Sequence, residues 1–147
     1  MSARRTPARL LAEAIAMIAE QAQVLRRSPT LSTPPLGPSA RRFANGAILV
    51  ESALSPPAML AFLKGIENRL GRRRYRRWGA RSVDIDIILW SGGMWRSRTL
   101  TIPHAAYRTR SFVLTPLLAV APGWRDPHLA ITVRHLHARL QKAAPKS

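Results

Sequence analysis

The spacing of apolar residues predicts two amphipathic helices in the first half of the chain. Thr6 can cap a helix, and Pro7 suits the first helical position. The apolar positions that follow at helical spacing are Leu11, Ile15, Ile18, Ala22 and Leu25. Ser55 and Pro56 repeat this start signal, and Gly71 is the predicted helix end. The apolar positions of the second helix are Met59, Phe62, Leu63, Ile66 and Leu70.

Runs of β-branched and apolar residues predict the strands. They cover residues 24–32, 43–54 and 82–90, followed by a turn at 91–93, a return strand at 94–98 and an extended segment at 100–102. Residues 112–120 predict a helix, and Thr132 can cap a last helix that ends near Leu140. This order predicts one α+β layered domain over residues 1–147, with a mostly antiparallel sheet and helices on one side.

Composition narrows the class of protein. Apolar residues make up 46% of the chain, which is typical of a globular protein, and the absence of cysteine excludes disulfides and thiolate metal sites. No run approaches the roughly 20 apolar residues of a membrane span, and Glu13 and Glu20 interrupt the first apolar segment. We therefore expect a cytoplasmic protein without a membrane partner.

The formal net charge of +17 favours an anionic partner, such as nucleic acid, an acidic membrane or a polyphosphate. Arginine outnumbers lysine 21 to 3, which GC-rich coding would also produce. The charge alone therefore leaves a functional and a purely compositional explanation open.

Asp84 and Asp86 are the one place where two of the seven acidic residues lie close together in the sequence. Side chains alternate along a strand, so both carboxylates point the same way, roughly 6–7 Å apart. Adjacent carboxylates resist joint ionisation, so a cation is expected between them. Mg²⁺ suits this pair because it takes one or two carboxylates together with waters and substrate phosphates. Salt bridges to neighbouring arginines are the alternative.

Seven arginines occupy the thirteen residues 69–81, immediately before the paired aspartates. Guanidinium groups match phosphate oxygens, and phosphoryl transfer needs cations and metal beside the phosphates. A solvated basic loop is the alternative interpretation. The uncharged segment 28–40, with four prolines, is expected either to connect elements or to cover a site. Asn45 either satisfies local backbone or pairs with the edge of a heterocycle.

Four sequence blocks occur in a fixed order: Thr33–Pro38, Phe43–Asn45, Arg76–Leu89, and Leu100–His104 together with Arg110–Phe112. With these blocks the chain resembles the 6-hydroxymethyl-7,8-dihydropterin pyrophosphokinase family of folate biosynthesis, from about Val24 to Asp126. The resemblance implies a ferredoxin-like α+β fold. It also implies an ATP-dependent pyrophosphokinase, a diphosphotransferase that passes the β,γ-pyrophosphoryl group of ATP to the pterin hydroxymethyl group and releases AMP.

The resemblance implies roles for particular residues. Asp84 and Asp86 match the ligands of two Mg²⁺ ions that bridge the triphosphate, and Glu67 matches an acidic position whose role the resemblance leaves open. The positions that match the family's ATP-binding residues are Arg72, Arg74, Arg81, Thr101, His104 and Arg110. Of these, Arg72, Arg74 and Arg81 are also expected to be catalytic, together with the two aspartates. The positions that match the pterin pocket are Thr33, Pro34, Leu36, Phe43, Asn45, Trp78 and Phe112. Trp78 and Phe112 would sandwich the pterin ring.

One departure from the family is clear. Its members begin with a strand before the first helix, whereas this sequence starts at the helix, so we expect the true start to lie upstream of Met1. An inactive truncated relic and a basic nucleic-acid-binding protein are the alternatives. Outside the resemblance, Trp78 and Phe112 would be interpreted as core aromatics and His104 as a turn residue. The expected partners are ATP and the pterin, bound by a monomer without nucleic acid.

Overall fold

The computed structural model describes residues 6–33, 43–73 and 83–143 of the chain. Its helices are α1 (Pro7–Ile18), α2 (Pro56–Arg73), α3 (Ser111–Val120) and α4 (Val133–Ala143), with a 3-10 turn η1 (Tyr107–Thr109) before α3. Its strands are β1 (Gln23–Arg27), β2 (Leu31–Thr33), β3 (Phe43–Asn45), β4 (Ile48–Glu51), β5 (Trp95–Arg96) and β6 (Thr101–Ile102). The predicted α+β class is confirmed. Within these residues no helix is both long and apolar enough to cross a membrane.

All strand pairs within the described ranges are antiparallel, but they form three separate two-stranded sheets. β1 pairs with β4, placing Val24 opposite Val50, and β2 pairs with β3, placing Leu31 opposite Asn45. β5 pairs with β6. The expected antiparallel strand direction is therefore confirmed. The expectation of one sheet is wrong for the described residues, because their strands form three separate pairs.

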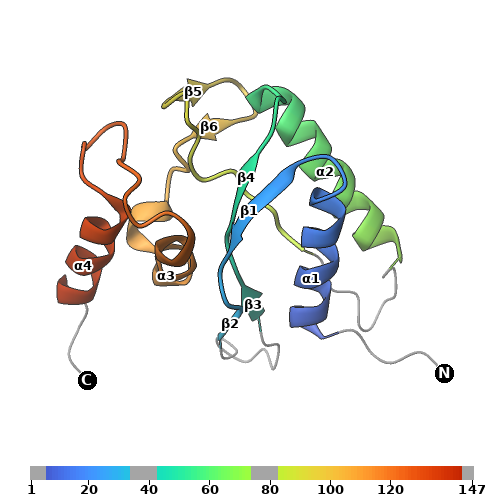
Figure 1. Ribbon diagram of the computed structural model, residues 1–147, viewed down its shortest axis with the longest axis horizontal. Coiled ribbons are helices and arrows are strands. Elements are labelled where there is room, and N and C mark those ends of the chain that lie inside the picture. Colours follow the sequence, from blue (N-terminus) through green and yellow to red (C-terminus); the bar gives the residue numbers. More distant parts are fainter. Residues whose placement is uncertain (1–5, 34–42, 74–82, 144–147) are drawn as a thin grey trace.

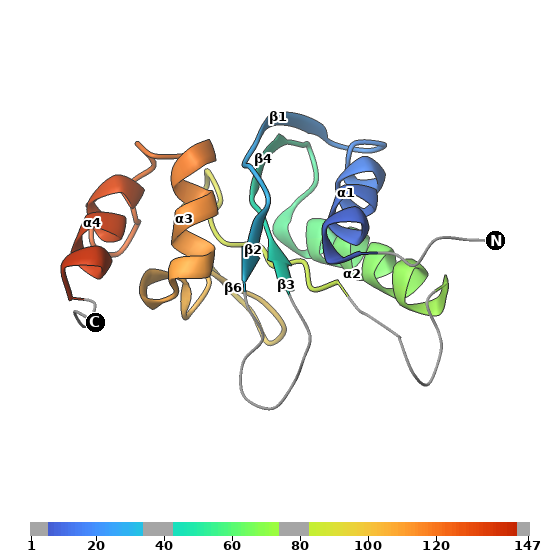
Figure 2. The same ribbon diagram turned by 90° about the horizontal axis from the view of Figure 1, so that it is seen from below.

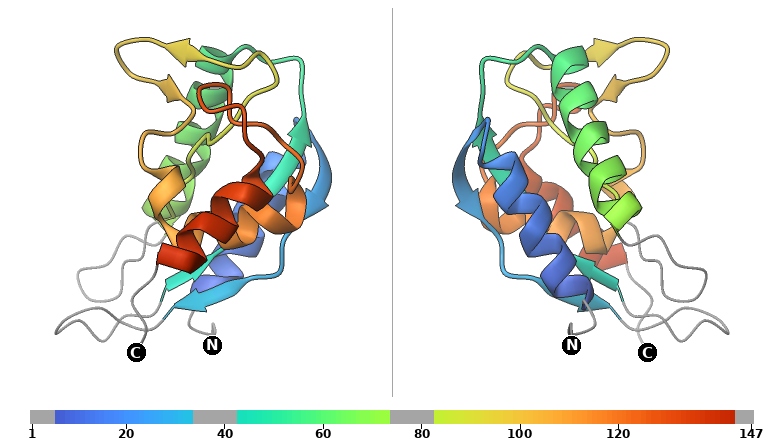
Figure 3. Two further views of the ribbon diagram at one scale, coloured as in Figure 1. Left: turned by 90° about the vertical axis from the view of Figure 1, so that its left-hand side faces the viewer. Right: turned by 90° about the vertical axis from the view of Figure 1, so that its right-hand side faces the viewer.

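The helices lie on two sides of the β1–β4 pair (Figure 1). Ile48 and Val50 pack into a core with α1 and α2, whereas Ala47 and Leu49 pack into a second core with α3 and α4. The two views in Figure 3 look onto these two helical layers from opposite sides. The expectation of helices on one side only is wrong, because the β4 region is apolar on both faces and each face needs a cover.

Residues 83–90 form no strand, contrary to the prediction for 82–90, and Figure 2 draws them as a yellow-green coil. The predicted alternation is nevertheless present. Val83, Ile85 and Ile87 pack against the first core, while Asp84 and Asp86 are exposed between them. A strand requires a hydrogen-bonded neighbour, and no strand of the described ranges pairs with this segment. Sequence pattern thus predicted the burial of the segment and not its pairing.

The three predicted N-terminal caps form, with hydrogen bonds from Arg9 N to Thr6 Oγ1 (3.1 Å), Ala58 N to Ser55 Oγ (3.3 Å) and His135 N to Thr132 Oγ1 (3.1 Å). The predicted stripe is correct in part: Ile18 and, after the helix end, Ala22 are buried in the first core, but the buried face of α1 is completed by Leu10 and Ala14 instead of Leu11 and Ile15. The helix ends at Ile18, so Leu25 falls in β1, where it is 49% exposed. A helix that ends early cannot extend its apolar stripe.

Gly71 does not end α2, which continues to Arg73. A glycine inside a helix costs about 1 kcal/mol relative to alanine. Burial of a leucine side chain contributes roughly 1.5–3 kcal/mol, and Leu70, directly before the glycine, is 1% exposed. Tertiary packing at Leu70 therefore outweighs the local preference of Gly71.

The turn predicted at 91–93 forms, and Gly93 adopts φ +94° while its N–H donates to the Trp90 carbonyl at 2.9 Å. Glycine has no side chain to disfavour this φ. The strand that follows pairs differently from the prediction, because Trp95 lies opposite Ile102 of β6. The hairpin therefore closes on residues 101–102 and leads directly into the segment that carries His104.

Candidate active site

A cavity of about 440 Å³ lies between α2, the segment 83–90 and the residues around β6. Its lining residues are Leu60, Lys64 and Glu67 from α2, Asp84 to Ile87, and Thr99, Leu100, Thr101, His104 and Ala105. Four predicted site residues thus come together, namely Asp84, Asp86, Thr101 and His104. A second, more open hollow beside Glu20 and Glu51 contains none of the predicted site residues.

Asp84 and Asp86 reach the cavity from the same side of their segment. Both are exposed, while Val83, Ile85 and Ile87 around them are partly buried. This alternation follows from an extended backbone whose apolar side chains pack on the first core. The two carboxylates therefore both lie at one cavity.

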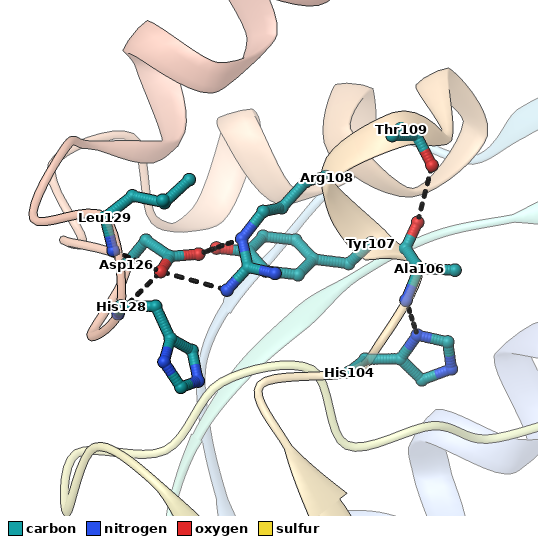
Figure 4. A network of polar contacts seen from close by, with 8 residues as sticks. All are labelled: His104, Ala106, Tyr107, Arg108, Thr109, Asp126, His128 and Leu129. Carbon is teal, nitrogen blue, oxygen red and sulfur yellow. Dashed lines mark hydrogen bonds and ion pairs between the residues drawn. The ribbon is translucent and has the colours of Figure 1, made fainter.

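His104 is oriented by two hydrogen bonds. Its backbone N–H donates to the Ile88 carbonyl at 3.0 Å, and its ring Nδ1 accepts the Ala106 N–H at 3.2 Å, as Figure 4 shows for the ring. With Nδ1 accepting, a neutral ring carries its proton on Nε2. Nε2 lies 3.9 Å from Asp86 Oδ2. His104 therefore offers an N–H donor to the cavity close to Asp86.

α2 adds two charged residues to the cavity: Lys64, which the sequence did not single out, and Glu67, whose role the resemblance left open. Lys64 Nζ lies 3.9 Å from Glu67 Oε1, and Glu67 Oε2 accepts the backbone N–H of Ile85 at 2.6 Å. Their i,i+3 spacing puts them on one face of a helix whose apolar stripe was predicted, which was the signal available for finding them. Across residues 6–33, 43–73 and 83–143, no three His, Cys, Asp or Glu residues form a group that could hold a metal alone.

A buried network fixes the chain beyond His104 (Figure 4). Asp126 accepts hydrogen bonds from Tyr107 OH (2.5 Å), from Arg108 Nε (2.6 Å) and Nη2 (3.0 Å), and from the backbone N–H groups of His128 (2.8 Å) and Leu129 (3.0 Å). Asp126 is 1% exposed and Tyr107 is fully buried. The network thereby ties η1, which lies between His104 and Arg110, to the loop before α4.

The network shifts the pKa of each of its ionisable groups. Burial alone would raise the pKa of Asp126, but hydrogen bonds from Arg108, Tyr107 and the two backbone N–H groups outweigh it and hold that pKa well below its usual range. Burial, with the hydrogen bond and charge of Asp126 added, raises the pKa of Tyr107 above its usual range. The hydrogen bond to Asp126 raises the pKa of Arg108. A carboxylate, a neutral phenol and a guanidinium are the stable forms at neutral pH.

Three other predicted site residues with described side chains, Arg110, Phe112 and Asn45, lie outside the cavity lining. Phe112, the second residue of α3, is 41% exposed, and the Arg110 guanidinium carbon lies 5.9 Å from its ring centroid. Asn45 is half-buried in β3, opposite Leu31 of β2. The exposed ring of Phe112 is accessible for stacking. Asn45 lies in the β2–β3 pair, whose described side chains do not line the cavity.

Some predicted positions are described only in part or not at all. The backbones of Thr33 and Phe43 are register partners in the β2–β3 pair, and Arg72 lies in the last turn of α2. The predicted site residues that lie outside the described residues are Pro34, Leu36, Arg74, Trp78 and Arg81.

The chain is a strongly basic α+β protein. Three of its seven acidic side chains, those of Glu67, Asp84 and Asp86, line the same cavity. A family model described as 7,8-dihydro-6-hydroxymethylpterin-pyrophosphokinase matches residues 2–122. The chain belongs to this family, which confirms the resemblance inferred from the four sequence blocks.

Three relatives with the name 2-amino-4-hydroxy-6-hydroxymethyldihydropteridine pyrophosphokinase illustrate the similarity. The Synechocystis sp. protein is 38% identical over 114 residues, which is 78% of this chain and 58% of the relative. The Methylorubrum extorquens protein is 40% identical over 101 residues, 68% of this chain and 64% of the relative. The Haemophilus influenzae protein is 36% identical over 119 residues, 79% of this chain and 74% of the relative. The chain thus spans less than two thirds of the first two relatives.

Proposed function

We propose that this chain transfers the pyrophosphoryl group of ATP to the hydroxymethyl group of 6-hydroxymethyl-7,8-dihydropterin and releases AMP, a step in folate biosynthesis. The observation that carries the proposal is the convergence of Asp84, Asp86 and His104 on one cavity in a member of this family. The chain is further proposed to act as a monomer in the cytoplasm.

The donor set of the cavity fits Mg²⁺. Asp84 and Asp86 supply exposed carboxylate oxygens, and their number leaves the remaining coordination to waters and phosphate oxygens, which is the arrangement that Mg²⁺ prefers. We propose that these two residues hold two Mg²⁺ ions together with the triphosphate. When bound, the ions supply neutralisation of the charge that develops on the transferring phosphates.

The residues of the chain bind and orient the reactants. We assign the Nε2–H donor of His104 and the hydroxyl of Thr101 to the polyphosphate, since both residues line the cavity beside the carboxylates. Arg72, Arg74, Arg81 and Arg110 are proposed as further phosphate contacts. The pterin hydroxymethyl oxygen bonds to the β-phosphorus, the bond from that phosphorus to the α,β-bridging oxygen breaks, AMP leaves, and the alcohol proton passes to solvent. No strong base is required for this transfer.

The pterin is proposed to lie against Phe112, whose exposed ring supports a stacking role. Trp78 is proposed for the opposite face of the pterin ring and Asn45 for its hydrogen-bonding edge. The remaining proposed pocket positions are Thr33, Pro34, Leu36 and Phe43.

We further propose that the layers are those of a ferredoxin-like fold, as the resemblance implies, and that one more strand lies between β4 and the segment 83–90. The support is the burial of apolar side chains from both segments in the same two cores, although the segments are not paired with each other. A chain extended upstream of Met1 tests this: amides of residues 83–89 should exchange more slowly with solvent than in the 147-residue chain. Equal exchange would count against the additional strand.

AMP release in the presence of ATP, Mg²⁺ and the pterin tests the activity. We expect AMP that requires both Mg²⁺ and pterin and that is lost in Asp84→Ala and Asp86→Ala. Glu51→Ala, at an exposed carboxylate of β4, is the matched control and should retain activity. AMP release that ignores pterin, or that survives both aspartate substitutions, would contradict the proposal.

A further inference from the structure

Glu67 contacts the backbone of the residue that lies between the two predicted metal ligands. Its Oε2 atom accepts the backbone N–H of Ile85 at 2.6 Å, and Ile85 is the residue between Asp84 and Asp86. Glu67 comes from α2, eighteen positions earlier in the chain, and its side chain is 20% exposed at the cavity wall. A hydrogen bond to a charged carboxylate is stronger than one between neutral groups.

The contact matters because residues 83–90 have no strand pairing within the described ranges. A backbone outside a ladder needs other partners for its N–H groups, and Glu67 supplies one at Ile85. The Ile88 carbonyl, which accepts the His104 N–H at 3.0 Å, provides a second attachment. Since side chains alternate along an extended segment, holding the Ile85 N–H toward α2 also fixes the direction of its two neighbours.

The geometry distinguishes positioning from direct metal binding. One oxygen of Glu67 is occupied by the Ile85 N–H, and the other lies 3.9 Å from Lys64 Nζ. Glu67 and the two aspartates do not form a three-residue metal group in the part of the chain that the structure describes. One oxygen of Glu67 therefore accepts a backbone hydrogen bond, and the other lies near a lysine ammonium group.

We propose that Glu67 is a positioning residue that anchors the Ile85 backbone to α2 and thereby holds Asp84 and Asp86 toward the cavity for a divalent cation and its nucleotide. This inference rests on the proposed function, since it assigns a task to Glu67 in the same site. The resemblance left the role of Glu67 open. In this proposal Glu67 acts by holding the backbone of Ile85 and does not contact the reactants.

Two substitutions separate the hydrogen-bond acceptor from the charge. Glu67→Gln removes the charge and keeps an oxygen that can accept the Ile85 N–H, whereas Glu67→Ala removes both. Mn²⁺ binding in the presence of ATP, measured by electron paramagnetic resonance without pterin, reports on the site without turnover. We expect Glu67→Ala to weaken Mn²⁺ binding by about 10–100-fold, the range that follows from loss of an outer-shell residue that orients metal ligands. Glu67→Gln should stay close to the unsubstituted chain.

The Ile85 amide resonance provides a structural readout in the metal-free protein. It should shift in Glu67→Ala and stay near its original position in Glu67→Gln. Glu20→Ala, at an exposed carboxylate outside this cavity, is the matched control and should change neither readout. If Glu67→Ala fails to fold, Glu67→Gln still tests the proposal. In that variant the Ile85 amide resonance must stay near its original position and Mn²⁺ binding must be retained.

Either of two results would overturn the proposal. One is Mn²⁺ binding by folded Glu67→Ala equal to that of the unsubstituted chain. The other is Glu67→Gln weakened as much as Glu67→Ala, which would mean that the charge acts and not the backbone anchor. Neither result depends on AMP formation, so failure of the pyrophosphokinase assay in the unsubstituted chain would be a separate finding about the proposed function.

Discussion

Replacement of Asp126 should destabilise the protein more than any surface substitution. The carboxylate accepts five hydrogen bonds, including two from the Arg108 guanidinium and one from the Tyr107 phenol, and is almost fully buried. Asp126→Ala leaves these donors without their acceptor. Removing one partner of a buried ion pair costs about 3–5 kcal/mol, which is a large part of the roughly 5–15 kcal/mol that keeps a domain folded.

The assay is urea unfolding followed by tryptophan fluorescence at pH 7, comparing free energies of unfolding. Arg125→Ala is the matched control, because Arg125 is an exposed neighbour whose Nη1 donates to the Ala130 carbonyl. We expect the control to lose about 1 kcal/mol or less, as for an ordinary hydrogen bond at the surface. Arg108→Met combined with Asp126→Leu should recover stability relative to Asp126→Leu alone, since the partly buried cation is then removed as well.

The pH dependence of the Asp126 effect has a definite sign. The folded pKa of Asp126 lies below its unfolded value of about 3.9, so its contribution is present above that value and is lost as the pH falls through the folded pKa. The stability difference between the unsubstituted chain and Asp126→Asn should therefore be largest near neutral pH and shrink below about pH 4. A difference that stays constant down to strongly acidic pH, or a loss in Asp126→Ala no larger than in Arg125→Ala, would refute this account.

Two further substitutions test local features. Thr6→Ala should lower the free energy of unfolding by about 1 kcal/mol because the Arg9 N–H loses its cap, whereas Thr6→Ser should retain most of it; equal urea midpoints for all three chains would contradict the capping role. Phe112→Ala should raise the KM for the pterin by the equivalent of about 1–3 kcal/mol of ring stacking with little change for ATP, and Phe112→Trp should restore it; an equal rise for both substrates would exclude a pterin-specific role.

Local signals were readable from the sequence where a structural contact spans only a few residues. The caps at Thr6, Ser55 and Thr132 each join positions three residues apart, so residue type and spacing were sufficient. The alternation around Asp84 and Asp86 was readable for the same reason, since apolar neighbours reveal which side is buried. These features predicted the α+β class and the carboxylate pair of the candidate site.

Contacts between residues far apart in the sequence could not be predicted from the sequence. The Tyr107 and Arg108 bonds to Asp126 span 19 and 18 positions, and no spacing rule connects these residues. The Glu67 contact with Ile85 likewise depends on how α2 packs against the first core. The pairing of β5 with β6 and the lack of pairing at 83–90 depend on which strands become neighbours, and strand patterns alone do not specify partners.

One variant separates the pyrophosphokinase from the nucleic-acid-binding alternative, because the two functions require changes of opposite sign. A chain with a formal charge of +17 should bind DNA weakly and without sequence preference, with an affinity that falls steeply as salt rises. Replacing both Asp84 and Asp86 by alanine removes two negative charges, so DNA binding measured by fluorescence anisotropy should become slightly tighter. The same variant should lose Mg²⁺-dependent AMP formation, since phosphates can approach these carboxylates only when a cation lies between them. Weaker DNA binding by the double variant would show that the aspartates serve nucleic acid directly, and the assignment of the cavity to a nucleotide would then fail.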